Sequence, residues 1–113
     1  MWSPALWPKA LAPFEVVVVL ANADDEAIRA EAERIHAALG ERGLETVLDD
    51  RPERAGVKFA DADLIGYPIQ VVVGKRGFER GEAEFKVRAT GERSAAPLGD
   101  AVDTAVALLA TAP

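Results

Sequence analysis

Two runs of apolar, β-branched residues constrain the fold of this chain more than any other feature. The segment FEVVVVL spans Phe14 to Leu20, and the segment PIQVVVG begins at Pro68. A strand with one face in water alternates polar and apolar residues, whereas a continuous apolar run is typical of a strand covered on both faces. The two runs therefore predict an α/β protein in which helices cover both faces of a sheet.

The rest of the chain predicts the remaining elements by its apolar spacing, which is three to four residues in helices and two in half-buried strands. The resulting order is β-α-β-α-β-β-α, which predicts a mixed, mostly parallel sheet of four or five strands with three helices. The first expected helix has Ile28, Ala32, Ile35 and Leu39 as its apolar positions, the second runs from Lys58 to Ile65, and the third from Leu98 to Leu109. The two further strands are Leu44 to Leu48 and the segment around Ala83, Phe85 and Val87. The segment KRGFER is expected to form a charged loop.

The first expected helix carries recognisable signals at both ends. Asn22 or Asp24 is expected to cap its N-terminus. Asp25 and Glu26 then fall in the first turn, where the helix dipole favours anions. Gly40 is expected just beyond its C-terminal end, where glycine is common.

Composition and charge exclude several classes of protein. The 113 residues include no cysteine, so disulfides, thiolate catalysis and cysteine-ligated metals are excluded, and a cytoplasmic location is expected. No segment approaches the roughly 18 apolar residues that cross a bilayer, so no membrane partner is expected. The net charge is −6, yet residues 51–93 hold nine basic and seven acidic side chains, a balance of +2. This region favours an anionic partner.

Few residues suit catalysis or metal binding. The single histidine, His36, lies beside the apolar side of the first helix, and neither Ser3 nor Ser94 follows a strand as a nucleophilic serine does. The pairs Asp24–Asp25 and Asp49–Asp50 follow strands and have the chemistry to hold Mg²⁺, but the first pair already has a capping role. We therefore expect no catalytic residue, metal or cofactor. A Mg²⁺-dependent domain that uses these four carboxylates is the alternative interpretation of the acidic pairs.

A set of basic residues lies near the ends of the expected strands. Arginine and lysine bind phosphates, and planar groups on a sheet edge read the bases of single-stranded RNA. RNA binding is therefore one interpretation, and the other is a solvated face whose arginines pair with neighbouring acids. The residues are Arg51, Arg54, Lys58, Lys75, Arg76, Arg80, Lys86 and Arg88.

Three segments carry a resemblance to a known family: WPKALAPFEVVVV, LDDRPERAGVKFADADLIGYP and VVVGKRGFERGEAEFKVRATGE. Together they closely resemble the C-terminal anticodon-binding domain of bacterial-type prolyl-tRNA synthetases, which are class II aminoacyl-tRNA synthetases. The similarity runs from about Trp7 to Leu109, and its most specific part is the ungapped pattern D-D-R-x-E-R-x-G-x-K-F-x-D-A-D-L-I-G-x-P. The resemblance implies a mixed five-stranded sheet with three helices.

The resemblance also implies which residues meet the anticodon loop of a proline tRNA. In such domains the turn after the second strand and the strand after the hairpin face that loop. Guanines are the expected bases, since Arg or Lys reads their O6 and N7 atoms and Glu accepts from their N1 and N2 protons. Carried over by position, the contacts are Arg51, Pro52, Glu53 and Arg54; Gly56 for close backbone approach; Lys58 on phosphate or base; Lys86 on a base, with Arg88 beside it; and Asn22 at the same end of the sheet.

The resemblance further implies that the chain is one module of a larger ligase. Residues 1–13 would be the interdomain linker and residues 14–113 the anticodon-binding domain, expressed as an excised fragment. The ATP and proline sites of the parent are absent from this sequence, so the isolated chain is not expected to be an enzyme. The implied partners are the anticodon loop, the catalytic domain and, through the parent enzyme, a second copy. The alternative is a free-standing accessory module for protein interactions, in which Trp2 and Trp7 matter more than Arg51.

Overall fold

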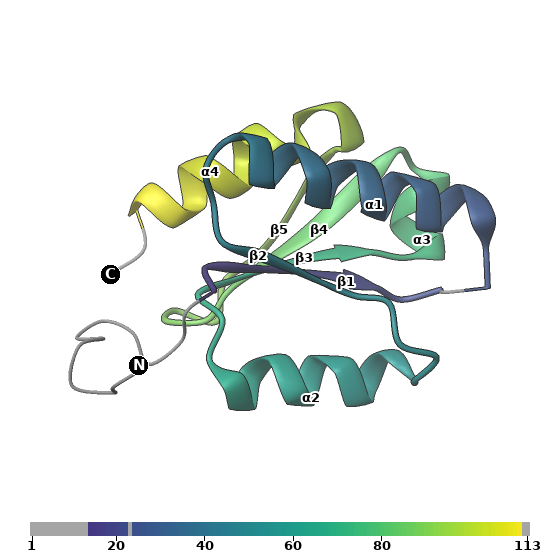
Figure 1. Ribbon diagram of the computed structural model, residues 1–113, viewed down its shortest axis with the longest axis horizontal. Helices are drawn as coiled ribbons and strands as arrows, with labels where there is room; N and C mark the ends of the chain where they lie inside the picture. Colours follow the sequence, from purple (N-terminus) through teal and green to yellow (C-terminus); the bar gives the residue numbers. More distant parts are fainter. Residues whose placement is uncertain (1–13, 23, 112–113) are drawn as a thin grey trace, which may run out of the picture.

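Helices cover both faces of a central sheet in the computed structural model, which describes residues 14–22 and 24–111 (Figure 1). Helices α1 and α4 lie on one face of the sheet, and α2 lies on the other (Figure 1). The predicted linker, residues 1–13, lies outside the described residues. The elements in chain order are β1 (Val16–Leu20), α1 (Glu26–Glu41), β2 (Thr46–Asp49), α2 (Ala55–Ile65), β3 (Ile69–Val73), α3 (Lys75–Glu79), β4 (Glu82–Val87), β5 (Arg93–Pro97), the 3₁₀ turn η2 (Leu98–Asp100) and α4 (Ala101–Thr111).

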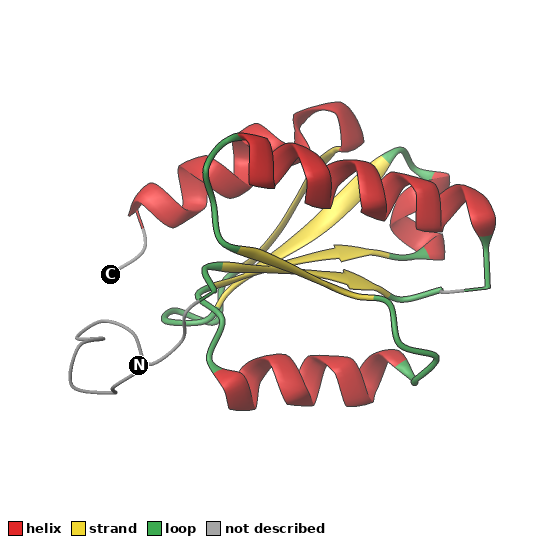
Figure 2. Cartoon of the chain, viewed as in Figure 1, coloured by secondary structure: helices red, strands yellow, loops and turns green. Residues whose placement is uncertain are grey.

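The sheet, drawn in yellow in Figure 2, has five strands in the order β2-β1-β3-β4-β5. Strand β1 pairs parallel with β2 and β3, with Val18 opposite Leu48 on one side and Val71 on the other. Strand β4 pairs antiparallel with β3 and β5, so four strands run in one direction and β4 is reversed. The predicted mixed, mostly parallel five-stranded sheet is confirmed.

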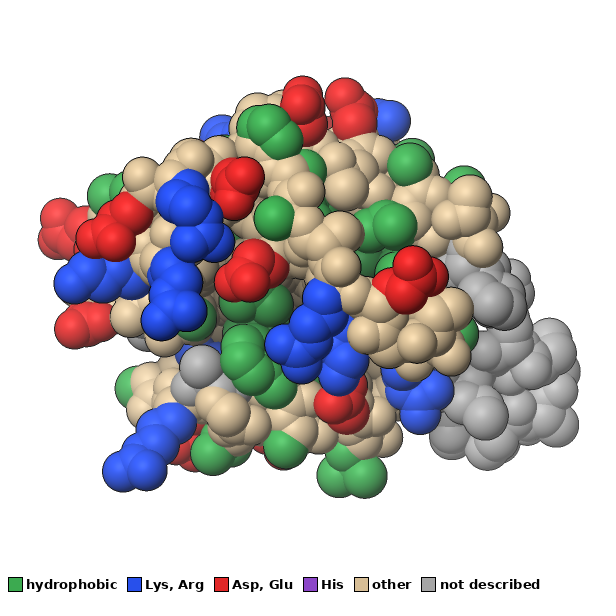
Figure 3. Space-filling view, turned by 180° about the vertical axis from the view of Figure 1, so that it is seen from behind, with side chains coloured by type: hydrophobic (Ala, Val, Ile, Leu, Met, Phe, Trp, Pro, Cys, Tyr) green, Lys and Arg blue, Asp and Glu red, His purple; other side chains and the backbone are tan. Residues whose placement is uncertain are grey.

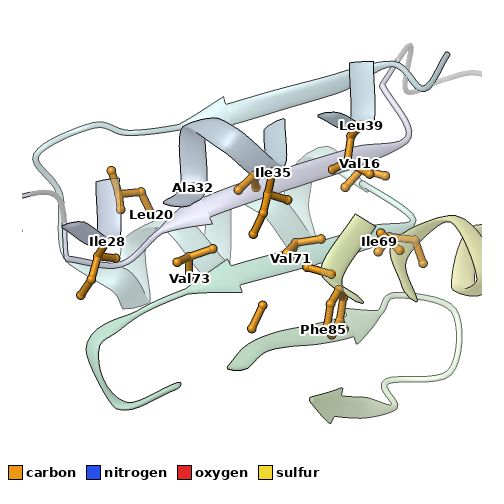
Figure 4. Close-up of a cluster of buried hydrophobic side chains, with 14 of the residues drawn as sticks. Val16, Leu20, Ile28, Ala32, Ile35, Leu39, Ile69, Val71, Val73 and Phe85 are labelled. Atoms are coloured by element: carbon orange, nitrogen blue, oxygen red, sulfur yellow. The ribbon is translucent and has the colours of Figure 1, made fainter. Parts of the chain in front are cut away.

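The core is divided by β1, whose five residues are all buried. Val16, Val18 and Leu20 point toward α1 and α4 and belong to the larger apolar cluster (Figure 4). Val17 and Val19 point the other way and pack in a smaller cluster beneath α2. A strand buried on both faces explains the continuous run of valines and confirms the interpretation of that segment.

The number of α-helices differs from the prediction, because four are present in the described residues and not three. The extra helix is α3, which occupies the segment predicted as a charged loop. Its five residues carry no apolar stripe, so spacing alone cannot reveal it. Helix α2 also begins at Ala55 and not at Lys58, because the Arg54 carbonyl oxygen already accepts the first helical hydrogen bonds, from the N–H groups of Val57 and Lys58.

Both predicted ends of α1 are corrected by the structure. Asp25 is the N-cap, because its Oδ1 accepts hydrogen bonds from the N–H groups of Ala27 and Ile28 at 3.0 and 3.1 Å. Gly40 lies inside the helix, and the turn that ends it contains Gly43 with a φ of +85°. Glycine adopts this left-handed conformation without a steric penalty, which explains why the chain turns there.

Candidate functional site

Arg51 follows β2 and is held by two carboxylates. Its Nε and Nη2 atoms donate to Asp49 at 2.9 Å each, and Nη2 also donates to Asp61 of α2 at 2.9 Å. The hydrogen bond from Arg51 lowers the pKa of Asp49 and outweighs burial, which acts in the opposite direction. The Arg51 side chain is still about half exposed, at 46%, so its partners orient it while part of it remains accessible to a ligand.

The residues between Arg51 and α2 form an exposed turn. Pro52, Glu53 and Arg54 are all exposed, and Arg54 adopts an extended conformation as the N-cap of α2. Gly56 is also exposed, and a Cβ built on it would meet nothing within 4 Å. Internal packing therefore does not require glycine at this position, and the side chains of the turn face solvent.

Lys58 is the predicted contact that the structure does not present to a ligand. Its side chain is fully buried, and its Nζ donates to the Leu20 carbonyl oxygen at 2.7 Å and to that of Asp49 at 3.5 Å. Burial lowers the pKa of this amine, while the charge of Asp49 opposes the shift. Since Leu20 and Asp49 are the last residues of β1 and β2, Lys58 ties α2 to the carboxyl ends of both strands.

Asn22 likewise has an internal partner. Its Oδ1 accepts a hydrogen bond of 2.7 Å from the backbone N–H of Lys75, the first residue of α3. The contact holds the end of β1 against the start of α3. A Cβ built on Gly74 would lie 3.2 Å from the Cβ of Ala21, so the two chain segments approach closely here.

Lys86 on β4 belongs to a second cluster, centred on Asp63 of α2. Its Nζ lies 3.1 and 3.2 Å from the Asp63 carboxylate, and Gln70 of β3 donates to the same carboxylate at 2.8 Å. Arg88 reaches the Asp63 carbonyl oxygen at 3.4 Å. Burial raises the pKa of Asp63, but the hydrogen bonds from Lys86 and Gln70 lower it overall. Asp63 thereby holds two predicted basic contacts side by side, namely Lys86 of β4 and Arg88, which directly follows the strand.

An open groove lies beside this cluster, between α2 and the outer half of the sheet. We call it the α2–β4 groove. Seen from behind, Lys and Arg side chains lie on both sides of a hollow in which hydrophobic side chains are visible (Figure 3). The groove therefore combines apolar walls with charges of both signs. Its lining consists of Phe59, Gln70, Val72, Glu84, Phe85, Lys86 and Arg93.

A second groove lies on the other side of α2, against the edge strand β2, and we call it the α2–β2 groove. Arg51 lines this groove, whereas Lys86 lines the α2–β4 groove. Helix α2 therefore separates two side chains that the sequence analysis places on one surface. The lining consists of Val17, Val47, Leu48, Asp49, Arg51, Asp61, Ala62, Ile65 and Tyr67.

The sequence analysis missed three polar residues of the α2–β4 groove, namely Gln70, Glu84 and Arg93. Gln70 interrupts an otherwise apolar run, and this interruption is the one sequence signal that could have identified it. The structure shows that Gln70 is buried, which is uncommon for a glutamine. Glu84 and Arg93 lie on neighbouring antiparallel strands, and their proximity depends on the register of β4 with β5. Within the part of the chain that the structure describes, no group of three or more His, Cys, Asp or Glu is arranged to hold a metal ion.

Comparison with known proteins gives one family for this chain. The family model described as an anticodon binding domain matches residues 15–108. The match covers all five strands and most of α4. It includes Arg51, the exposed turn after it, and both grooves beside α2. None of the helices in the described ranges is long and apolar enough to cross a membrane.

The similar curated proteins are called proline–tRNA ligases. The protein of Geobacillus kaustophilus (strain HTA426) is 53% identical over 92% of this chain, and that of Gloeobacter violaceus (strain ATCC 29082 / PCC 7421) is 53% identical over 86%. The protein of Rhizobium meliloti (strain 1021) is 47% identical over 90% of the chain. The chain spans 18%, 16% and 23% of the lengths of these relatives, respectively. These matches favour the anticodon-binding interpretation over the accessory-module interpretation.

Proposed function

The chain belongs to the family of anticodon-binding domains, and on that premise we propose that it recognises the anticodon loop of proline tRNA as the C-terminal module of a proline–tRNA ligase. Its relatives are proline–tRNA ligases several times longer than this chain. Residues 1–13 then form the interdomain linker and residues 14–113 the tRNA-binding domain. The chain itself contributes binding, and aminoacylation takes place in the catalytic domain.

The observation that carries this proposal is the chemistry of the α2–β4 groove. Lys86 and Arg93 offer cationic donors, which suit the O6 and N7 atoms of a guanine. Glu84 is exposed in the same groove and offers a carboxylate that accepts from the N1 and N2 protons of a guanine. Phe59 supplies an apolar, aromatic surface, the kind on which unstacked RNA bases rest. One open groove thus holds donors for the O6 and N7 atoms of a guanine, an acceptor for its N1 and N2 protons, and an aromatic surface for its ring.

The exposed turn after β2 contributes a second set of contacts. Arg51, Glu53 and Arg54 project near the N-terminal end of α2, while Lys86 and Arg88 contact its C-terminal half at Asp63. Arg54 and Asp63 are nine residues apart, so the two sets are separated by about 14 Å along the helix axis. We assign the turn, with Pro52 and Gly56, to the phosphates and flanking bases of the loop. The internal hydrogen bonds of Asn22 and Lys58 give these two residues a positioning role.

The location and partners of the chain follow from this role. A ligase that charges tRNA for translation works in the cytoplasm, so we place the chain there. Its partners are the anticodon loop and the catalytic domain of the same enzyme, and a homodimer would form through the parent enzyme. Neither a cofactor nor a membrane enters the proposed function.

The test is a chemical-shift titration of the chain with the anticodon stem-loop of proline tRNA and with the same stem carrying a scrambled loop. We expect Lys86→Ala to weaken binding of the proline stem-loop by about 5- to 150-fold, since a good base contact contributes about 1–3 kcal/mol. The shifts should concentrate on residues that line the α2–β4 groove.

The matched control is Arg42→Ala, which removes the same charge on the opposite face, where Arg42 pairs with Asp103. It should change affinity far less than Lys86→Ala, because it alters net charge without touching the groove. The proposal is wrong if the two variants lose affinity equally, or if the scrambled loop binds as well as the proline loop. Circular dichroism of both variants checks that the fold is intact.

A further inference from the structure

Two cations lie directly opposite each other on neighbouring strands of the α2–β4 groove. The register of the sheet aligns Gln70 of β3 with Lys86 of β4, and Lys86 with Arg93 of β5. All three residues line the groove, so they form one row across the sheet on the side where α2 lies (Figure 1). Like charges at directly opposite positions of an antiparallel pair destabilise a sheet. The stability of the sheet therefore gives no reason for this row of cations.

The carboxylate of Asp63 is the charge that this row meets on α2. Both of its oxygens contact the Nζ atom of Lys86, at 3.1 and 3.2 Å. An ammonium group has three N–H donors, so at least one remains for a ligand in the groove. The Lys86 side chain is 24% exposed and that of Asp63 is 46% exposed. A ligand that reaches the mostly enclosed ammonium group must therefore lie beside the more exposed carboxylate.

The negative charge of Asp63 is not needed by α2 itself. Asp63 lies in the last turn of the helix, where the helix dipole favours cations and disfavours anions. Gln70 donates to its Oδ1 at 2.8 Å, but the amide oxygen of an asparagine would accept this hydrogen bond as well. Arg88 contacts the backbone carbonyl oxygen of Asp63 and not its side chain. The charge therefore acts on Lys86 and on any ligand that approaches it.

A carboxylate at this position affects a phosphate and a base differently. A phosphate carries a full negative charge, which Asp63 repels, and Glu84 of the same groove adds to the repulsion. A guanine is neutral, and its O6 and N7 atoms accept hydrogen bonds from a lysine without bringing a net charge. Asp63 therefore disfavours a phosphate beside Lys86 but leaves the contact with a base open.

We propose that Asp63 is a specificity-determining residue, which orients the Lys86 ammonium group toward a base and keeps phosphates out of the α2–β4 groove. The inference rests on the proposed function, because it states how that site distinguishes the bases of the anticodon from the backbone that all RNA shares. Phosphate contacts carry no sequence information. Excluding them turns Lys86 from a general RNA contact into one that reads sequence, at the expense of affinity.

The test compares Asp63→Asn with the unmodified chain by anisotropy of two labelled RNAs. One is the anticodon stem-loop of proline tRNA, and the other is the same stem-loop with every guanine of the loop replaced by uridine, so both carry the same phosphates. Asp63→Asn should bind the uridine loop about fivefold more tightly, the effect of one full charge at close range in water. For this RNA, the slope of log K against log salt should steepen by about 0.7, which corresponds to one further phosphate.

The affinity of Asp63→Asn for the proline stem-loop should change little, because a guanine in the groove is neutral. Discrimination between the two RNAs should therefore fall by about as much as binding of the uridine loop rises. Asparagine keeps an oxygen that accepts from Gln70 and Lys86, so α2 should remain in place, and circular dichroism checks this.

Asp103→Asn is the matched control, because it removes the same charge on the opposite face, where Asp103 pairs with Arg42. It should leave the ratio of the two affinities unchanged. Unchanged discrimination in Asp63→Asn, or an equal loss in Asp103→Asn, would overturn the inference and leave the proposed function standing. Equal binding of the two RNAs by the unmodified chain would instead overturn the proposed function, and the inference with it.

Discussion

At the scale of single residues, Lys58 shows how far a basic side chain can depart from the role that its type suggests. Its sequence context places it among exposed arginines, yet its ammonium group is fully buried and donates to the carbonyl oxygens that end β1 and β2. A buried ammonium group is costly unless it is hydrogen-bonded, and these two acceptors reduce that cost. Lys58 therefore fixes the start of α2, and with it the exposed turn that carries Arg51 and Arg54.

Replacing this amine should weaken the fold. Lys58→Met retains most of the aliphatic side chain but removes the donor to the Leu20 carbonyl oxygen, and a buried acceptor without a partner costs about 1–3 kcal/mol. We expect the free energy of unfolding, measured by urea denaturation, to fall by that amount. Lys75→Met, at an exposed position, should change it by less than about 0.5 kcal/mol. Equal or greater stability of Lys58→Met would show that an apolar side chain suits the site better than the amine does.

At the scale of elements, two glycines lie inside helices, and nothing in the local sequence distinguishes them, but their surroundings in the structure differ. Gly40 lies in the last turns of α1, and a Cβ built on it would meet nothing within 4 Å. Gly77 lies in α3 and is buried, and a Cβ there would be 2.8 Å from the carbonyl oxygen of Glu82. Helix α3 can therefore lie close to the start of β4 only because residue 77 has no side chain.

Alanine substitutions at these glycines should have opposite effects. Gly40→Ala should raise the free energy of unfolding by about 0.5–1 kcal/mol, the usual difference between the two residues inside a helix. Gly77→Ala gains the same intrinsic preference but must displace backbone, so the net change should be destabilising. Thermal and urea denaturation of both variants would measure this. A stabilised Gly77→Ala would mean that α3 does not pack against β4 as described.

At the scale of the whole molecule, a net charge of −6 opposes the proposed binding of RNA. The exposed cations near α2 are few, and Arg51 and Lys86 are already paired with carboxylates. Under the proposed function, the domain would therefore read a few bases at short range and would not attract nucleic acid over a distance. Affinity in the complete ligase would then depend on contacts that other domains make with the same tRNA.

The isolated chain should accordingly bind the proline anticodon stem-loop weakly and with a modest dependence on salt. Each phosphate neutralised contributes about −0.7 to the slope of log K against log salt for a single strand. We expect a slope that corresponds to only a few phosphates, measured by anisotropy of a labelled stem-loop at increasing KCl concentrations. Tight binding at physiological salt, or a slope typical of an extensive phosphate interface, would contradict this picture.

Much of the fold could be predicted from local patterns. The valines of β1 and β3 identified strands covered on both faces, and the alternation around Phe85 identified β4. Such patterns can be seen in the sequence alone, because a strand buried on one face alternates apolar and polar residues and a strand buried on both faces is continuously apolar. Helix α3 could not be predicted this way, since a five-residue helix has no apolar stripe and its position depends on the close approach of Gly77 to Glu82. The ends of α1 were missed because neighbouring residues offer several caps, and only the backbone conformation selects Asp25 and Gly43 among them.

The sequence by itself determined the family, the layered sheet, and the fact that basic residues gather after β2 and along β4. Only the tertiary structure decided that α2 lies between Arg51 and Lys86, that Lys58 points inward, and that Gln70, Glu84 and Arg93 complete a groove. The physical reason is that a local pattern records whether a side chain is buried, whereas a site depends on which distant segments are packed beside it.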